Sequence, residues 1–433
     1  MDRRTFLKTT AIASGAAMLG VWGETAWAAG RSDKAVGRAW KGWKKGHFQV
    51  HFIYTGVAES LFMIFPDGTS MLLDCGDHDA IGRGKLAVPV LPSPDRHSGD
   101  WIARYVERVN PNRSVIDYMM LSHYHCDHAG DPHFNDGTVT RNGETFALSG
   151  FTQAAERLTF RKAVDRAWPD YNDPLPMPDD YMGDIVAHIR SFFVRMQKQR
   201  GMEIEKFRVG ETGQIALQHD PARYPEFSVR NICGCGRIAA PDGTVTNLYE
   251  GFVETPEQEL NENGMSMGLV FSYGDFRFYT AGDFCDTFKK PDGTEVDVEA
   301  ELAKVCEPVH VAKVNHHGHY SMPAPLVSAL RPKVWVTCVW DQLHDVAPVM
   351  ERLASRSLYP GDRVLCPCIF PAERRAEDAG SPWLDDIAPA CFDGAHVVLD
   401  VTPGGKRYSI SLLDARDESM TVRSVLHFKT DRR

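Results

Sequence analysis

Hydrophobic and polar positions alternate in the first third of the chain in a way that predicts β-strands. Residues 47–76 alternate as three strands, the last two joined by a hairpin turn at 66–68. Residues 101–109 show helical spacing instead, and this spacing stops before Pro111. Residues 115–122 are a short apolar run of the kind that forms a buried strand. The pattern therefore predicts four strands with a helix between the third and the fourth.

The alternation of strands and helices returns in the last third of the chain. Hairpins are predicted over residues 265–283 and 394–414. Between them, single strands are predicted within residues 307–318 and 332–344. Alternating α and β elements with hairpins of this kind predict an α/β fold of two facing mixed sheets, with helices on the outside.

Residues 134–260 differ from both flanks because they are rich in Pro, Asp, Arg and aromatic side chains. Within them, residues 185–199 predict an amphipathic helix, and residues 169–181 predict a loop. We interpret residues 134–260 as a large insertion that shapes one wall of an active site. A small independent domain is the alternative interpretation.

Residues 1–28 predict an export signal rather than a part of the fold. An Arg-Arg pair at residues 3–4 opens a twin-arginine pattern, residues 11–23 are moderately apolar, and residues 26–28 form an A-x-A cleavage site. The apolar stretch is too short and too rich in Gly and Ala for a stable membrane span. We therefore expect export by the twin-arginine translocase to a periplasmic or secreted location. An uncleaved N-terminal anchor is the alternative.

Charge changes the range of possible partners. The 433-residue chain has a formal net charge of −10 at pH 7. Proteins that bind nucleic acid usually carry a basic patch, and no run of Lys and Arg in the body of this chain provides one. The composition therefore disfavours nucleic acid as a partner, and we expect a small-molecule or envelope-derived substrate.

The strongest chemical signal is a loop directly after the strand predicted at residues 115–122. Its residues His123, His125, Asp127 and His128 follow the pattern H-x-H-x-D-H. Imidazole nitrogens and carboxylate oxygens are the ligands that suit zinc and similar divalent ions. The loop therefore predicts a metal site, and a cluster this dense can reach two neighbouring metals.

Further candidate residues end other predicted strands, where a sheet can aim side chains into one cleft. Asp283 ends one hairpin, the pair His316 and His317 ends a strand, and His344 ends the next strand. Each of these alone is an ordinary polar residue at a strand end. Together with the H-x-H-x-D-H loop, they predict a single site.

These motifs resemble the metallo-β-lactamase superfamily, whose hallmark is the H-x-H-x-D-H loop, present here in LSHYHCDHAGD. Residues 47–131 and 261–355 further resemble the hydrolase domain of DNA-uptake competence proteins and the phosphorylcholine esterases, with NEN and HHG among the shared segments. The resemblance implies a metallo-β-lactamase αββα sandwich over residues 29–433. This fold has two mixed sheets, outer helices and, here, the large insertion 134–260.

The resemblance also implies which residues would hold metal. His123 and His125 would bind a first ion, Asp127 and His128 would bind a second ion, and Asp283 would bridge the two. The implied cofactor is a pair of divalent metal ions. Zinc suits this ligand set best, and manganese and iron are also compatible with it.

The remaining residues have implied roles near these metals. His344 falls where superfamily members place the last ligand of the second metal. His316 and His317 fall where related phosphodiesterases place a catalytic histidine against the scissile phosphate, although one of the two could be the metal ligand instead. Asp127 could also orient the nucleophile. Asp74, at the end of its predicted strand, would orient a ligand histidine.

Two departures from the family pattern stand out. Asn263 occupies the place of the usual third histidine of the first metal, and an amide oxygen is a weaker ligand. Residues 56–59 read GVAE where the competence proteins have GQGD. Cys126 occupies the variable position of the motif, and we expect it to point away from the metals.

Three functions are compatible with this sequence. The first is a metal-dependent hydrolase of phosphoesters, most simply phosphodiesters, that uses a metal-activated hydroxide. The second is a lactonase or amidase with the same dinuclear site. The third is a non-hydrolytic protein with a single metal, which the missing third histidine would suit.

Overall fold

The structure is a computed structural model that describes residues 33–78, 84, 87–134, 138–176, 181–255 and 258–431. The signal peptide predicted at residues 1–28 lies outside the described residues. Over the part of the chain that is described, no helix is both long enough and apolar enough to cross a membrane.

The larger sheet combines strands from the first half of the described chain with the last three strands of the chain. Its strands are β1 (Phe48–Phe52), β2 (Leu61–Ile64), β3 (Ser70–Leu73), β4 (Val115–Met120), β7 (Thr159–Asp165), β8 (Glu203–Lys206), β19 (Ala395–Val401), β20 (Arg407–Asp414) and β21 (Val422–Lys429). Among the described residues it has nine strands in the order β21-β20-β19-β1-β2-β3-β4-β7-β8. The sheet is mixed, because pairing is antiparallel from β21 to β3 and parallel from β3 to β8.

The second sheet is built from the middle of the chain. Its strands are β9 (Phe227–Gly234), β10 (Arg237–Ala239), β11 (Val245–Asn247), β12 (Gly268–Tyr273), β13 (Phe276–Thr280), β16 (Val311–Lys313), β17 (Val334–Thr337) and β18 (Val364–Pro367). The described strands number eight, in the order β11-β10-β9-β12-β13-β16-β17-β18. Pairing is antiparallel from β11 to β13 and parallel from β13 to β18, so this sheet is also mixed.

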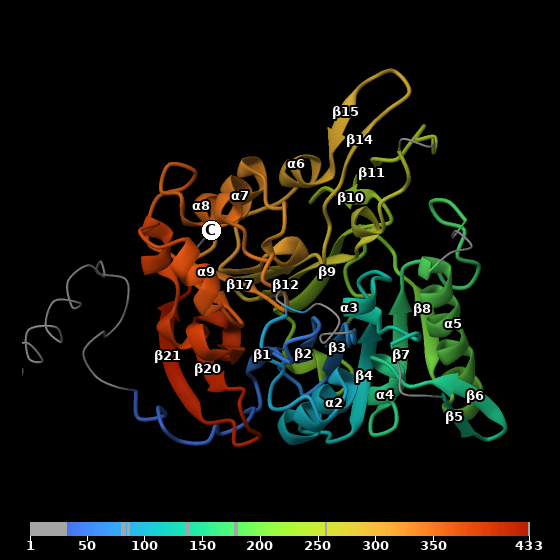
Figure 1. The fold of residues 1–433 in the computed structure, drawn as a ribbon, viewed down its shortest axis with the longest axis horizontal. Coiled ribbons are helices and arrows are strands. Elements are labelled where there is room, and N and C mark those ends of the chain that lie inside the picture. Colours follow the sequence, from blue (N-terminus) through green and yellow to red (C-terminus); the bar gives the residue numbers. More distant parts are fainter. Residues whose placement is uncertain are drawn as a thin grey trace, which may run out of the picture.

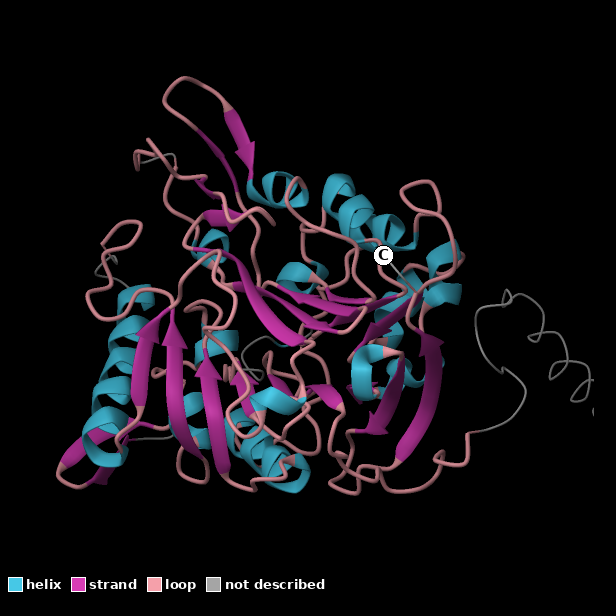
Figure 2. Cartoon of the chain, turned by 180° about the vertical axis from the view of Figure 1, so that it is seen from behind, coloured by secondary structure: helices cyan, strands magenta, loops and turns pink. Residues whose placement is uncertain are grey.

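The two sheets face each other across an aromatic core. Alternate side chains of a strand point to one face of its sheet, and those of β1 meet the second sheet. Phe48 stacks on Phe271 with ring centroids 5.6 Å apart, and Phe52 meets Phe278 edge-on at 5.9 Å. The facing layers are visible in Figure 2. Burial of this apolar interface is the main source of the fold's stability.

The described helices lie mainly on the outer faces of the two sheets. They are α2 (Ser98–Val109), α3 (Cys126–Ala129), α4 (Phe151–Ala154), α5 (Tyr181–Arg200), α6 (Val298–Ala303), α7 (Ala324–Leu330), α8 (Ala347–Ala354) and α9 (Ala372–Glu377). Helix α3 is instead part of the H-x-H-x-D-H loop after β4. The outward side chains of the first sheet, such as Phe62 and Leu72, pack with Ile102 of α2 and Ile189 of α5. Helices α6, α7 and α8 lie beside the second sheet (Figure 1). The predicted αββα architecture of two mixed sheets with outer helices is confirmed.

The segment predicted as an insertion, residues 134–260, contributes to both sheets. It supplies β7 and β8 to the first sheet and β9, β10 and β11 to the second. Its parts outside these sheets include α5, which covers the first sheet, and a small hairpin of β5 (Thr138–Arg141) and β6 (Glu144–Ala147). Another small hairpin, β14 (Thr287–Lys289) with β15 (Glu295–Asp297), projects from the molecule near α6 (Figure 1).

Candidate metal centre

The carboxyl ends of four parallel strands bring the candidate residues together. Strands β3 and β4 are parallel neighbours, so Asp74 and the H-x-H-x-D-H loop leave the first sheet at the same edge. Strands β13 and β16 are parallel neighbours in the second sheet, so Asp283 and the double histidine also leave at one edge. The edges of an open α/β sheet at the carboxyl ends of its strands are where ligand sites commonly form.

Two histidines are oriented by partners on their outer ring nitrogens. The Nδ1 atom of His128 lies 2.8 Å from Asp74 Oδ2, and the Nδ1 atom of His317 lies 2.7 Å from the carbonyl oxygen of Cys338. A carboxylate and a carbonyl can only accept a hydrogen bond, so each Nδ1 carries the proton. The Nε2 lone pairs of His128 and His317 are therefore the ring atoms that could bind a metal, which is the usual arrangement behind a histidine ligand. At His317 the indole N–H of Trp340, 3.3 Å away, is directed at the same nitrogen.

The two Nε2 atoms converge with two carboxylate oxygens. Asp127 Oδ2 lies 3.0 Å from His317 Nε2 and 3.3 Å from His128 Nε2. Asp283 Oδ2 lies 3.1 Å and 3.2 Å from the same two nitrogens. The two Nε2 atoms are themselves only 3.3 Å apart. Lone pairs this close repel each other unless a cation lies among them, so this donor set fits a divalent metal ion.

The charges around this group favour the same conclusion. Burial opposes a charge on His317, yet the carboxylates of Asp283 and Asp127 raise its pKa to about 10. The pKa of His128 is likewise raised against burial, by Asp283, Asp127 and Asp74. A site with this much negative charge takes up protons or a metal ion, and the two compete for the same nitrogens. Asp283 Oδ1, also buried, has no hydrogen-bond partner among the described residues, as expected of a carboxylate that holds metal.

We call Asp127, His128, Asp283 and His317 the metal group. Asp74 positions His128 and is not a member of this group. Its backbone has φ of 60°, and its side chain accepts hydrogen bonds from Ser122 N at 2.6 Å and from Ser122 Oγ at 2.7 Å. These contacts leave the carboxylate fixed against the His128 ring.

We expect Asp74→Asn to weaken zinc binding about 10- to 100-fold, because an amide orients the His128 ring less well and makes it less basic. Competition for zinc with a chromophoric chelator measures this loss. Asp242→Asn, in the exposed turn between β10 and β11, should leave the affinity unchanged. Equal affinities for all three proteins would mean that His128 does not depend on Asp74.

His123 and His125 lie next to the metal group. His123 Nε2 is 3.0 Å from His125 Nδ1 and 3.9 Å from Asp283 Oδ2. The same Asp283 oxygen thus faces His123, His128 and His317, and the rings of His123 and His128 lie against each other with centroids 4.2 Å apart. A shared carboxylate is what the predicted bridging role would need.

The side chains of the two adjacent histidines point in different directions. His316, His317 and Gly318 all have left-handed backbone conformations, with φ of 45°, 51° and 73°. His317 reaches Asp127 and Asp283, whereas the ring of His316 turns towards Cys285 Sγ at 3.2 Å and Asn263 Nδ2 at 3.3 Å. Of the three histidines that the sequence left open as the last ligand, His317 is the one that reaches the group of Asp127, His128 and Asp283.

His344 and Asn263 lie next to the group rather than in it. The His344 ring stacks on the His317 ring with centroids 4.6 Å apart and planes 13° apart, and its Nδ1 accepts a hydrogen bond from Trp340 N. Asn263 contacts His316 through Nδ2, and its buried Oδ1 has no hydrogen-bond partner among the described residues.

Two buried residues of this site were not singled out from the sequence. Glu59, in the GVAE segment, belongs with His128, Asp283 and His317 to a group whose ligand atoms all lie within 4.8 Å of one another. Lys313 donates to Gly282 O at 2.8 Å and pairs with Glu59 Oε2 at 2.9 Å. Both residues could have been recognised in the sequence, because each is a lone charged residue within an otherwise apolar segment.

Lys313 supplies a fixed positive charge next to the metal group. Its side chain is fully buried, and its Nζ lies 3.7 Å from Asp283 Oδ1. Burial opposes its charge, but the carboxylates of Glu59 and Asp283 raise the pKa of Lys313 above its ordinary value. The ammonium therefore stays charged and offsets part of the negative charge of the site.

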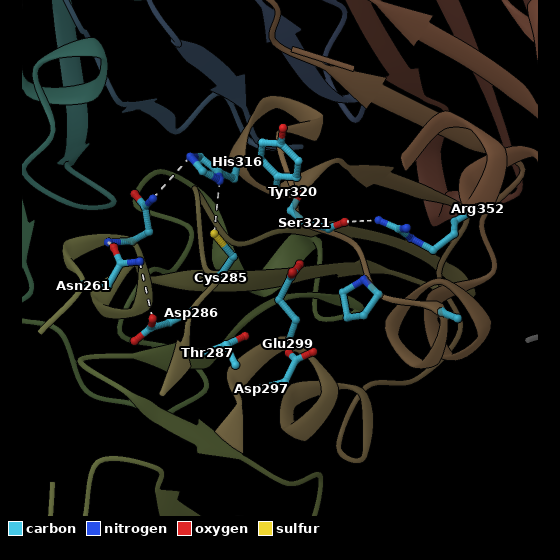
Figure 3. Close-up of a pocket in the computed structure, with 13 residues that line it drawn as sticks. Asn261, Cys285, Asp286, Thr287, Asp297, Glu299, His316, Tyr320, Ser321 and Arg352 are labelled. Carbon is cyan, nitrogen blue, oxygen red and sulfur yellow. Dashed lines mark hydrogen bonds between the residues drawn. The ribbon is translucent and has the colours of Figure 1, made fainter. Parts of the chain in front are cut away.

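A cavity of about 500 Å³ opens beside the metal group. It begins at His316, Asn263 and Cys285, and all of its lining residues fall between positions 261 and 352 (Figure 3). The wall of this cavity thus comes from outside the segment 134–260, which had been expected to shape the active site.

No protein-family model matches the chain, and no curated protein matches it in sequence. Among solved structures, the chain is similar to Tm1679, a metal-dependent hydrolase of the β-lactamase superfamily. The sequence identity is 11% and the TM-score is 0.31, and the match covers 74% of this chain and 96% of that chain.

Proposed function

We propose that this chain is an exported metal-dependent hydrolase of the metallo-β-lactamase superfamily that cleaves phosphodiester bonds. One observation carries the metal-dependent part of the proposal. His128 and His317 are held by Asp74 and by Cys338 O so that both Nε2 lone pairs converge on the oxygens of Asp127 and Asp283. The export part rests on the twin-arginine pattern of residues 1–28.

The residues divide into two ligand groups that share Asp283. Asp127, His128 and His317 would hold one divalent ion with it, and His123 and His125 would hold the other. A bound metal pair supplies Lewis acidity and lowers the pKa of water to about 7, so that a nucleophile is available at neutral pH.

His316 is the residue placed to meet the substrate. It lines the cavity beside the metal group, and burial lowers its pKa to about 4, so the ring is neutral at pH 7. A neutral imidazole has one N–H, and because Asn263 Nδ2 donates to Nε2, this proton lies on Nδ1 beside Cys285 Sγ. His316 would donate to a phosphoryl oxygen by exchanging one of these partners for the substrate. This position and the HHG motif support a phosphodiester substrate.

The test combines elemental analysis of the mature protein with its hydrolysis of bis-p-nitrophenyl phosphate. We expect two divalent metals per chain, and turnover that a chelator removes and added zinc or manganese restores. Two metals without phosphodiester turnover would favour a lactonase or amidase instead. A single iron per chain, without hydrolysis, would favour the non-hydrolytic function.

A further inference from the structure

A buried ion pair lies behind the H-x-H-x-D-H loop. Arg166 follows β7, which pairs in parallel with β4, so both strands end at the same edge of the first sheet (Figure 1). The Arg166 guanidinium contacts Glu262 at two points, with Nε 3.1 Å from Oε1 and Nη2 2.5 Å from Oε2. The side chains are 2% and 9% exposed. A bidentate pair of this kind fixes the orientation of its partners as well as their distance.

This ion pair holds Tyr124, the residue inside the H-x-H part of the loop. The backbone N–H of Tyr124 donates to Glu262 Oε1 at 2.9 Å. The Arg166 guanidinium lies over the Tyr124 ring, with Cζ 4.4 Å from the ring centroid, which adds a cation–π contact. The Tyr124 hydroxyl donates to the Asp165 carboxylate at 3.0 Å. The main chain, the ring and the hydroxyl of Tyr124 are therefore each held by a separate contact.

The backbone of Tyr124 determines where its two neighbours lie. His123 and His125 flank it, and their rings meet with Nε2 and Nδ1 3.0 Å apart. Each histidine is joined to Tyr124 through a single peptide unit, so a rotation of the Tyr124 backbone would move both rings. The contacts of Tyr124 therefore fix the histidine pair for which we propose one of the two metal ions.

The ligands of the other ion take their orientation from different partners. His128 is held by Asp74 Oδ2, and His317 is held by the carbonyl oxygen of Cys338. Loss of the ion pair behind Tyr124 should therefore affect the two ions unequally.

We propose that Arg166 and Glu262 are positioning residues that set the affinity of the ion held by His123 and His125. The inference rests on the proposed function, because it concerns one of the two ions proposed there. It also gives the segment 134–260 a role at the site. This segment carries Arg166 and acts on the metal-binding loop from behind, whereas the cavity beside the metal group is lined by residues between 261 and 352.

The test removes the ion pair without leaving a buried charge. The double variant Arg166→Met, Glu262→Met has side chains of similar volume, and apolar replacement of a buried ion pair often preserves stability. It removes the carboxylate that accepts from Tyr124 N. In calorimetric titrations of the metal-free proteins with zinc, we expect one of the two ions to bind at least tenfold more weakly to the double variant. Unchanged affinities for both ions would overturn the inference.

A second variant keeps the charge and removes only the geometry. Arg166→Lys has no planar fork and cannot form the bidentate contact, so it should weaken the same ion about tenfold. The matched control is Arg363→Lys. Arg363 is also buried, at 1% exposure, and its guanidinium lies 3.9 Å from the ring centroid of Tyr359 and donates to three backbone carbonyl oxygens.

Arg363 precedes β18, so it lies at the amino ends of the parallel strands, away from the metal group. Arg363→Lys should therefore bind both ions as tightly as the unmodified protein. Equal losses of affinity in Arg363→Lys and Arg166→Lys would show that general destabilisation weakens the metal, and would overturn the inference.

A His123→Ala background identifies the ion that is affected. This variant lacks a ligand of one ion and should bind only the ion of His128 and His317. Adding Arg166→Lys to it should change the affinity for the remaining ion less than threefold. A tenfold loss in this background would show that the ion pair acts on the whole site, which contradicts a specific role at His123 and His125.

The number of bound ions separates failure of this inference from failure of the proposed function. Fewer than two ions in the unmodified protein would show that the two-ion site is wrong, and the inference would fail with it. Two ions without phosphodiester turnover would remove only the proposed reaction. The zinc titrations of the variants then still decide whether Arg166 and Glu262 position the histidine pair.

Discussion

Asp283→Ala should leave the protein without bound metal and reduce its hydrolysis of bis-p-nitrophenyl phosphate by at least about 1,000-fold. Asp283 Oδ2 lies 3.1 Å from His317 Nε2 and 3.2 Å from His128 Nε2, and the same oxygen lies 3.9 Å from His123 Nε2. Removal of this carboxylate takes a shared ligand from both groups at once. Elemental analysis of the purified variant measures the loss of metal, and its rate of hydrolysis measures the loss of activity.

The matched control for this variant is Asp275→Ala. Asp275 lies in the exposed turn of the same hairpin, between β12 and β13, so its loss removes equal charge without touching the site. Its metal content and rate should equal those of the unmodified protein. Full activity in Asp283→Ala would show that a site dependent on this carboxylate does not perform the reaction.

Lys313→Met should lower the free energy of unfolding of the metal-free protein by about 3–5 kcal/mol. Methionine has a similar volume, so the main loss is the positive charge that compensates Glu59. Both partners are fully buried, and their charged atoms are 2.9 Å apart. An unpaired carboxylate inside the protein is far more costly than the pair. Urea unfolding followed by tryptophan fluorescence measures the change.

Restoring the charge balance should restore most of this stability. We expect the double variant Lys313→Met, Glu59→Gln to recover more than half of the loss, because neither residue then leaves a buried charge alone. Lys304→Met provides the control, since Lys304 is 66% exposed in its ion pair with Glu301. Exposed pairs contribute little, so its effect should stay below about 1 kcal/mol. Similar losses for Lys304→Met and Lys313→Met would contradict a buried ion pair at Glu59.

The sequence predicted the strands and the convergence of their ends. Hydrophobic periodicity places 265–283 as the hairpin of β12 and β13, and 115–122 as the strand β4. Polar residues that end neighbouring strands can meet in one cleft, so the sequence predicted that Asp283 and the double histidine would join the H-x-H-x-D-H loop. The expectation that Asp283 contacts both metals came from the family resemblance. The spacing could not decide between His316 and His317, because this choice depends on a left-handed turn that adjacent identical residues do not reveal.

The sequence pattern could not predict which strands pair when they lie far apart in the chain. Residues 134–260 have irregular composition, yet β9 pairs with β12 inside the second sheet and β7 extends the first one. These strands contain charged residues at positions that the sheet leaves partly exposed, such as Arg230 and Lys162, and these interrupt the apolar signal. The Glu59–Lys313 pair joins residues far apart in the chain, so only the packing of the two sheets brings them together.

The pairing of β1 with β19 has a consequence for synthesis of the chain. Phe48 pairs with Val401 and Phe52 pairs with Val397, so one edge of the first strand has no partner until residues 395–401, more than 340 positions later, have been synthesised. An open strand edge invites pairing with other chains. A nascent or prematurely terminated chain that lacks residues 395–401 would carry that edge uncovered. The synthesis of β19, and not the emergence of the H-x-H-x-D-H loop, therefore sets the earliest time at which the first sheet can close.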